Sequence, residues 1–356
     1  MKRLLILLMT LIGLAGPAVA QRPAGYPQSY DALIEAARAE GGVRIYGNAD
    51  AAAMAALIAA FRRTYPGVAV RYEVLESRDI YRRVVTEAQR RVPSADLIWS
   101  SGMDLQAKLI NDGYAQAYHS PEKPALPADA VWKNMGYGVT AEPVAFVYNR
   151  RLIPPGRVPR THQAFEALLR AGRVPLTGKV ATYNPARSNV GYLYLAEDYA
   201  ITRDTRLLVQ AMAATRPWLS PQTEPMLAAV ADGRIAIAYN VVGPYALAAA
   251  QRDRRVGVVF PRDYTLIASR VAFIARDARR PAAAKLFLDF LLSRTGQTLL
   301  ARQWLLPVRS DVRAPRLSAG QQRPIRVGPE LLVNLDTIKR RRFLADWRAI
   351  LTEGSK

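Results

Sequence analysis

The sequence predicts an α/β protein made of two lobes. Short apolar strands alternate along the chain with helical segments of about 10–15 residues, a pattern typical of crossover units in mainly parallel sheets. About 335 residues follow the first twenty, and a chain of that length forms two domains that each bury a core. Half of the residues are apolar and none is cysteine, so disulfides, thiolate metal sites and thiol nucleophiles are excluded.

The first half of the chain predicts strand–helix units that follow an initial helix. Met54, Leu57 and Phe61 recur at helical spacing, and Pro66 with Gly67 ends that helix before the next strand. Helices are expected over 29–40, 51–65, 79–91 and 103–112, and strands over 43–46, 68–72 and 96–99.

The second half continues the alternation, with a Pro-rich stretch over 154–159 after its first strand. Strands are expected over 144–149, 180–183, 235–239, 256–260 and 271–274. Helices are expected over 161–170, 189–199, 225–232, 281–292 and 334–351. No internal repeat and no low-complexity segment is visible.

The first twenty residues have the features of a secretory signal peptide. Lys2 and Arg3 precede an apolar run over 4–14, and Ala18-Val19-Ala20 supplies the small residues of a cleavage site. The run is shorter than the ~20 residues that a membrane span needs. No cysteine follows it to carry a lipid anchor. We therefore expect a mature, exported protein that begins at Gln21.

The chain is strongly basic, with a formal net charge of +21. Such a field attracts anionic small molecules, membrane headgroups or nucleic acid, although a codon bias toward arginine and alanine would produce the same excess. The basic residues are scattered apart from the run over 339–342, which suits the solvated face of a helix. No basic motif is interleaved with aromatic residues, so we expect no nucleic-acid partner.

Motifs of enzymes are absent from the sequence. Its two histidines, His119 and His162, lie far apart, and neither belongs to a G-x-S-x-G, H-E-x-x-H or Gly-rich phosphate motif. The sequence predicts a protein that is not an enzyme, with no cofactor and no resident metal. An extracytoplasmic hydrolase is the alternative, which would need a general base beside a nucleophile.

Polar residues gather where the predicted strands end. Ligands of α/β sheets bind outside the carboxyl ends of strands, where helix N-termini, hydroxyls and amides meet. The candidate ligand-binding residues are Asn48, Ala49, Ser77, Arg78, Ser100, Ser101, Arg187, Ser188, Asn189, Tyr239 and Asn240. They fall in both halves of the chain, which predicts a site in a cleft between the two lobes.

The sequence also resembles a known family. The likeness rests on Phe61 to Val70 (FRRTYPGVAV), Ser94 to Gly113 (SADLIWSSGMDLQAKLINDG), Pro143 to Asn149 (PVAFVYN), Leu176 to Gly191 (LTGKVATYNPARSNVG) and Asp263 to Gln297 (DYTLIASRVAFIARDARRPAAAKLFLDFLLSRTGQ). These stretches resemble the type 2 periplasmic solute-binding proteins of ABC importers, the extracellular solute-binding protein family 1. Within it, the chain is most similar to the ferric-ion, phosphonate and phosphoglycerate binders.

The resemblance implies a two-lobed, type 2 periplasmic-binding-protein fold with crossovers near 140–143 and 264–267. It places lobe 1 at 21–142, lobe 2 at 143–265 and a return to lobe 1 at 266–306. Residues 307–356 are expected to pack across lobe 2. The implied protein is a periplasmic monomer whose hinged lobes close on a ligand and whose partner is an inner-membrane ABC permease. A sensor subunit for a histidine kinase would use the same fold.

Two ligand classes remain open at this point. Arg187 with Ser188 and Asn189 at a predicted helix start suits a small oxyanion, because arginine offers a forked donor to phosphate, phosphonate or carboxylate. Ferric binders of this family use adjacent tyrosines, and here the matching positions are Tyr239 and Tyr245, so the adjacent pair is missing. Further phenolates could come from Tyr46, Tyr183 and Tyr264.

Export with cleavage is directly testable. Protein recovered from the periplasm should have an intact mass that begins at Gln21, within one or two residues, because the small-residue site at Ala18 to Ala20 directs cleavage there. Mass spectrometry decides the matter. A mature chain that retains Met1 to Ala20 would contradict the prediction.

Overall fold

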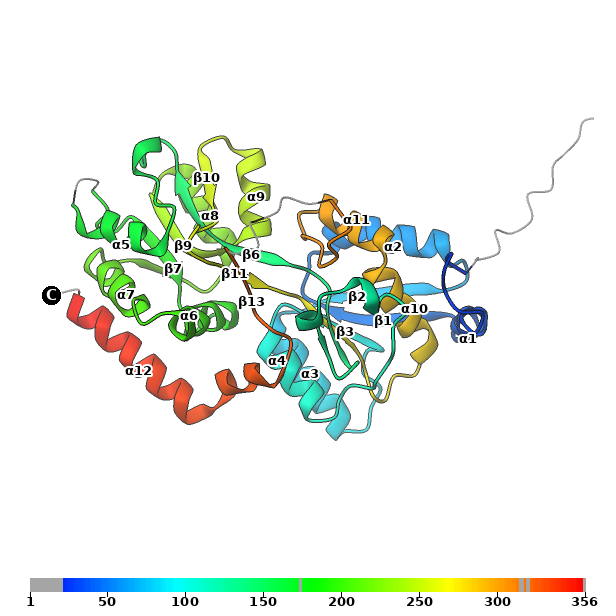
Figure 1. The fold of residues 1–356 in the computed structure, drawn as a ribbon. Helices are drawn as coiled ribbons and strands as arrows, with labels where there is room; N and C mark the ends of the chain where they lie inside the picture. Colours follow the sequence, from blue (N-terminus) through cyan, green and yellow to red (C-terminus); the bar gives the residue numbers. More distant parts are fainter. Residues whose placement is uncertain (1–21, 173–174, 314–316, 318–320, 355–356) are drawn as a thin grey trace, which may run out of the picture.

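The computed structural model describes residues 22–172, 175–313, 317 and 321–354, and it shows the two expected lobes side by side (Figure 1). Each lobe is one β-sheet with helices on both faces. The expected signal peptide, residues 1–20, lies outside the described residues. None of the helices in the described part has the length and apolar character that a membrane span requires.

Lobe 1 contains a six-stranded sheet in the order β2-β1-β3-β12-β5-β4. Its strands are β1 (Gly42–Gly47), β2 (Ala69–Val74), β3 (Leu97–Ser100), β4 (Val131–Trp132), β5 (Gly136–Gly138) and β12 (Val271–Ile274). Its helices are α1 (Tyr30–Glu40), α2 (Ala51–Thr64), α3 (Ser77–Gln89), α4 (Met103–Asn111), α10 (Pro281–Leu292) and α11 (Arg294–Arg302). Helices α1, α2, α10 and α11 bury one face of the sheet, and α3 and α4 bury the other.

Lobe 2 contains a second sheet in the order β13-β11-β6-β9-β7-β8, with β10 paired to β6. Its strands are β6 (Glu142–Asn149), β7 (Val180–Tyr183), β8 (Trp218–Ser220), β9 (Ile237–Val242), β10 (Val256–Val259), β11 (Thr265–Ala268) and β13 (Gln322–Pro324). Its helices are α5 (His162–Arg170), α6 (Asn189–Ile201), α7 (Thr205–Ala214), α8 (Thr223–Asp232), α9 (Gly243–Arg252) and α12 (Thr337–Gly354).

The sheets are mixed, which corrects the expectation of mainly parallel sheets. In lobe 1, β1 runs parallel to β2 and β3, but β12 runs antiparallel to β3 and β5. In lobe 2, β7 runs parallel to β8 and β9, whereas β6 runs antiparallel to β9, β10 and β11. A strand that enters a sheet directly from the other lobe has no crossover helix to restore its direction, so β6 and β12 oppose their neighbours.

The two crossings between the lobes lie next to each other. The first runs from β5 into β6, and the second runs from β11 into β12. Because β11 still pairs with β6, at Ile267 with Pro143 and Ala268 with Glu142, the chain returns to lobe 1 at Ser269 and Arg270. This return comes a few residues later than the expected 264–267. One apolar cluster continues through this junction and joins Phe273 of lobe 1 to Val144 of lobe 2.

The C-terminal segment contacts both lobes, where sequence reasoning expected lobe 2 alone. Strand β13 extends the sheet of lobe 2 along β11. The short 3-10 helix η5 (Pro329–Leu335) then packs on α4 of lobe 1 and buries Leu331. Helix α12 finally crosses back to lobe 2 and lies along α7 (Figure 1). The segment is therefore a third connection between the lobes.

Removing the anchor of α12 should destabilise the protein. Trp347 is 6% exposed and packs in the core of lobe 2, so Trp347→Ala should cost about 3–5 kcal/mol of unfolding free energy. The matched control is Ile338→Ala on the same helix, whose side chain is 76% exposed and should change little. Urea unfolding measures both variants, and equal losses would show that α12 is not held by Trp347.

Candidate functional site

A cleft of about 630 Å³ lies between the lobes. Lobe 1 contributes the ends of β1 and β2 and the start of α3, and lobe 2 contributes the starts of α6 and α8. The first crossing supplies Glu142 and the second supplies Arg270. Of the residues expected from the sequence, those that line the cleft are Asn48, Ser77, Arg78, Ser101, Arg187, Ser188 and Asn189. Tyr245, named for iron, also lines it.

The lobe 1 wall is a hydrogen-bonded cluster centred on Asn48. Its side-chain N–H group donates to Ser77 Oγ at 2.9 Å and to Ser101 Oγ at 2.6 Å. The backbone N–H of Ser101 donates to Asn48 Oδ1 at 3.1 Å. These residues meet because β1 and β3 are parallel neighbours whose carboxyl ends lie at the same edge. Ser100 lies behind the wall, where its hydroxyl donates to Ser77 Oγ at 2.9 Å, and it is 1% exposed.

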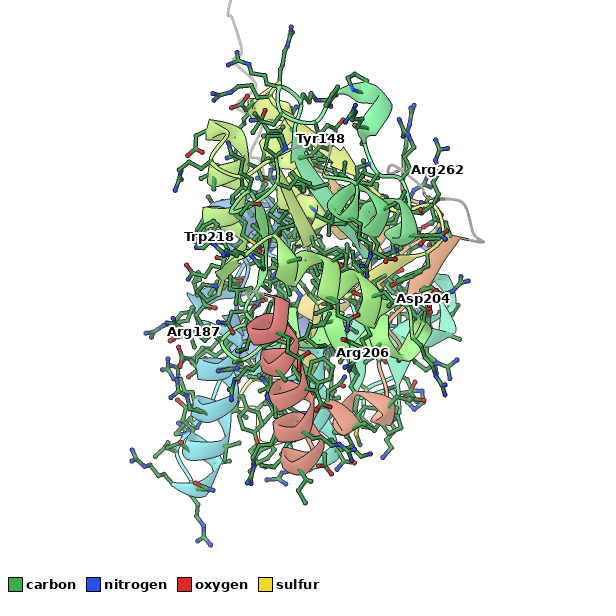
Figure 2. All side chains as sticks on the ribbon, turned by 90° about the vertical axis from the view of Figure 1, so that its left-hand side faces the viewer. Tyr148, Arg187, Asp204, Arg206, Trp218 and Arg262 are labelled. Atoms are coloured by element: carbon green, nitrogen blue, oxygen red, sulfur yellow. The ribbon has the colours of Figure 1, made fainter. Side chains whose placement is uncertain are left out.

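The lobe 2 wall is the beginning of α6. Ser188 caps the helix by accepting a hydrogen bond from the backbone N–H of Gly191 at 3.2 Å. Arg187 precedes the cap and is exposed at the margin of lobe 2 (Figure 2). The guanidinium groups of Arg187 and of Arg78, on the opposite lobe, form no hydrogen bond or ion pair with the described residues, so both are free to meet a ligand.

Asn189 makes a direct bond across the cleft. Its side-chain N–H group donates to Asp104 Oδ1 of α4 at 2.7 Å. Asp104 is fully buried, and its other carboxylate oxygen has no hydrogen-bond partner among the described residues. Burial raises the pKa of Asp104, which the hydrogen bond from Asn189 partly opposes. The bond joins the two lobes beside the ligand cleft.

Three helices begin at the cleft: α3 at Ser77, α6 at Asn189 and α8 at Thr223. The first N–H groups of a helix have no intrahelical acceptor and carry a partial positive charge. Helix starts from both lobes therefore direct donors into one cavity, an arrangement that favours an anionic group.

An ion pair between Glu142 and Arg270 forms the floor of the cleft. The Nε of Arg270 donates to Glu142 Oε1 at 2.8 Å, and both side chains are under 5% exposed. Arg270 also donates to Asn48 Oδ1 at 2.9 Å and to the hydroxyl of Tyr245 at 3.1 Å. Burial alone would lower the pKa of Arg270, but the nearby Glu142 carboxylate and Tyr245 raise it above its ordinary value. The floor thus ties lobe 1, lobe 2 and both crossings together.

Sequence reasoning missed both members of this pair. The available signal was a single charge inside an apolar stretch: Arg270 within TLIASRVAFI and Glu142 within AEPVAFVY. A charge that a strand carries into the interior needs a partner there, because an unpaired buried charge is costly. The two residues are 128 positions apart in the sequence, so the pairing itself becomes visible only in the fold.

Four of the expected ligand residues do not line the cleft: Ser100, described above, and Tyr239, Asn240 and Ala49. This corrects the sequence-based assignment. Tyr239 and Asn240 donate to the buried carboxylate of Asp198 at 2.7 and 2.5 Å. Strand β9 runs on to Val242, so these two residues lie within the strand and not at its end. Ala49 is 2% exposed, and its backbone bonds the Tyr72 hydroxyl.

Most of the tyrosines that were considered as iron ligands also lie outside the cleft. Tyr239 is buried with Phe146 and Phe165, and burial with the Asp198 charge raises its pKa well above the ordinary value. Tyr264 bonds Asp198 as well, and Tyr46 bonds Glu87 in lobe 1. Only Tyr183 and Tyr245 of the five line the cleft. The described residues include no group of three or more histidine, aspartate or glutamate side chains placed to hold a metal ion.

Two α/β lobes around a polar cleft define a two-lobed binding protein, and the comparisons with known proteins agree. Residues 43–304 match the model of the bacterial extracellular solute-binding protein family. The structure of a substrate-binding protein of an ABC transporter from Agrobacterium tumefaciens is 34% identical, with 87% of this chain and 94% of that chain covered and a TM-score of 0.80. None of the curated proteins compared with the sequence matches it.

More distant structures share the fold. The periplasmic binding protein AfuA from Actinobacillus pleuropneumoniae, with fructose-6-phosphate bound, is 18% identical over 87% of this chain and 99% of that chain, with a TM-score of 0.66. Iron-bound HitA from Pseudomonas aeruginosa is 17% identical over the same shares, also with a TM-score of 0.66. The chain belongs to the bacterial extracellular solute-binding protein family, and the resemblance seen in the sequence is confirmed.

Breaking the floor ion pair should destabilise the protein strongly. Glu142→Ala leaves the buried Arg270 guanidinium without its counter-charge, which typically costs about 3–5 kcal/mol of unfolding free energy. Asp277→Ala is the matched control, since it removes an exposed ion pair with Arg276 and should cost less than about 1 kcal/mol. Urea unfolding compares them, and a similar small loss in both would show that the buried pair is not needed for the fold.

Proposed function

We propose that the protein is the periplasmic binding subunit of an ABC importer. It captures a small oxyanion in the interlobe cleft and delivers it to an inner-membrane permease. The transport role is supported by the family and by the Agrobacterium relative, which is described as the substrate-binding protein of an ABC transporter. The periplasmic location is supported by the leader-like first twenty residues.

The observation that supports an oxyanion ligand is the set of hydrogen-bond donors that both lobes direct into one cavity. From lobe 1 come Ser77, Ser101 and the guanidinium of Arg78; from lobe 2 come Arg187 and the start of α6. An anion leaves water only where such donors replace its hydration. Because the donors belong to both lobes, a bound phosphonate, phosphate ester or carboxylate would hold the cleft closed.

The overall positive charge of the chain does not define the site. The cleft is lined by the carboxylates of Asp50, Glu76, Asp79, Glu142 and Glu224 and by the guanidinium groups of Arg78, Arg82, Arg187 and Arg270. The lining therefore carries no excess of basic residues. The net charge of +21, or +19 once Lys2 and Arg3 are removed with the signal peptide, can speed the approach of an anion, but recognition must come from individual donors in the cleft.

Removing the Arg187 guanidinium should weaken binding. A charge-assisted hydrogen bond contributes about 1.5–3 kcal/mol, so Arg187→Ala should lower the affinity roughly ten- to a hundredfold. Ser101→Ala should lower it less, because Ser101 is a neutral donor. Arg206→Ala, on the outer face of lobe 2 in Figure 2, is the control and should bind like the parent protein.

Calorimetry over a panel of phosphonates, phosphate esters, dicarboxylates and ferric citrate measures these affinities. Binding of at least one oxyanion that depends on Arg187 supports the proposal. If ferric ion alone bound, with a visible tyrosinate-to-iron absorption band, the oxyanion assignment would be wrong, and Tyr183 and Tyr245 would be the cleft tyrosines to mutate.

A further inference from the structure

We propose that the floor of the cleft binds hydroxyl groups, so that the ligand is a polyhydroxylated oxyanion such as a polyol phosphate or a sugar acid. This inference rests on the proposed function, which places the oxyanion at the helix starts on the cleft walls. It concerns the groups in the lower part of the same cavity: Tyr194, Glu142 and Arg270.

Tyr194 is a largely buried cleft residue whose hydroxyl is unpaired but not among the fully buried atoms. It lies on α6, is 2% exposed and lines the cleft. Its hydroxyl makes no hydrogen bond with any described residue. The phenol of a buried tyrosine normally bonds to a neighbour, as Tyr183 does with Thr223 and Tyr245 with Arg270. Tyr194 is thus the cleft tyrosine whose donor and acceptor are both left for a ligand.

Glu142, which also lines the cleft, has one carboxylate oxygen without a donor. Its Oε1 accepts from Arg270 Nε at 2.8 Å and from the hydroxyl of Thr140 at 2.9 Å. Its Oε2 has no hydrogen-bond partner in the described part of the chain, although the side chain is only 4% exposed. Oε2 is not among the fully buried unpaired atoms, so it is open to the cleft, where a ligand hydroxyl can donate to it.

Arg270 has free donors in the same place. A guanidinium carries five N–H groups, and three are used, on Glu142, Asn48 and Tyr245. One N–H on each terminal nitrogen remains. The floor therefore offers two donors from Arg270 and one acceptor from Glu142. The hydroxyl of Tyr194 can donate or accept a hydrogen bond.

The charges of this set determine what it can bind. Arg270 and Glu142 cancel each other, so the floor has no net charge to attract the oxyanion itself. A hydroxyl group suits it because one hydroxyl can donate to Glu142 Oε2 and accept from an Arg270 N–H at the same time. An alkyl chain in this position would leave all of these groups unpaired. Sites built to bond a hydroxyl reject analogues that lack it for this reason.

The experiment compares matched ligands on the full mature protein by calorimetry. Sorbitol 6-phosphate is compared with hexyl phosphate, and gluconate with hexanoate, so each pair shares its anion and chain length and differs in hydroxyl groups. At least one hydroxylated member should bind a hundredfold or more tightly than its alkyl counterpart. The two pairs distinguish a phosphate from a carboxylate head.

A variant then assigns the effect to the floor. Tyr194→Phe removes one hydroxyl and keeps the ring, so it should weaken the hydroxylated ligand about tenfold and leave its alkyl counterpart unchanged. The control is Tyr199→Phe on the same helix, which packs against Phe343 away from the cleft and should change neither. If Tyr194→Phe does not fold, the comparison of matched ligands on the parent protein still decides.

Two outcomes would overturn the inference, and they differ. If the hydroxylated and alkyl members of each pair bind equally, the floor does not recognise hydroxyl groups, while oxyanion capture stands. If neither pair binds, and inorganic phosphate and simple phosphonates do not bind either, the proposed function itself fails and the inference fails with it.

Discussion

The ion pair between Arg270 and Glu142 is the constraint on which the rest of the structure depends. Each residue lies on one of the two crossings, and the pair fixes these strands against each other at 2.8 Å. Two further N–H groups of Arg270 donate to Asn48 of lobe 1 and to Tyr245 of lobe 2. Because a buried charge tolerates little displacement from its partner, the hinge and the bottom of the cleft are set by the same contact. The walls are then positioned by ordinary strand and helix geometry above it.

The residues of the lobe 1 wall could be predicted from the sequence because a simple rule applies to them. Asn48, Ser77 and Ser101 follow strands whose carboxyl ends meet at one edge, so order along the chain is enough to bring them together. Tyr239 and Asn240 failed the same rule because β9 ends three residues later than its apolar pattern suggested, at Val242. The later end of the strand is accompanied by a shift of register against β6 and a positive φ at Asn240, which no pattern of side chains reveals.

Other features depend on contacts between distant parts of the chain. The short strands β4, β5, β8 and β13 carry too few residues for a periodic signal and exist because a longer neighbour offers its free edge. The direction of β6 and β12 follows from their entry from the opposite lobe. Helices α7, α9 and α11 were not assigned, although Leu208, Val209 and Met212 of α7 lie on one buried face. For α7 the signal was present, and for the short strands it was not.

The C-terminal segment has a kinematic consequence. Two adjacent strands that join two bodies leave them free both to bend and to twist about the junction. The path from β13 through η5 to α12 attaches at separate points on lobe 2, lobe 1 and lobe 2 again, so twisting would pull η5 away from α4. Bending about a single axis remains. A ligand-free protein restricted to this one motion samples fewer conformations. A ligand that fixes the two lobes therefore costs less conformational entropy.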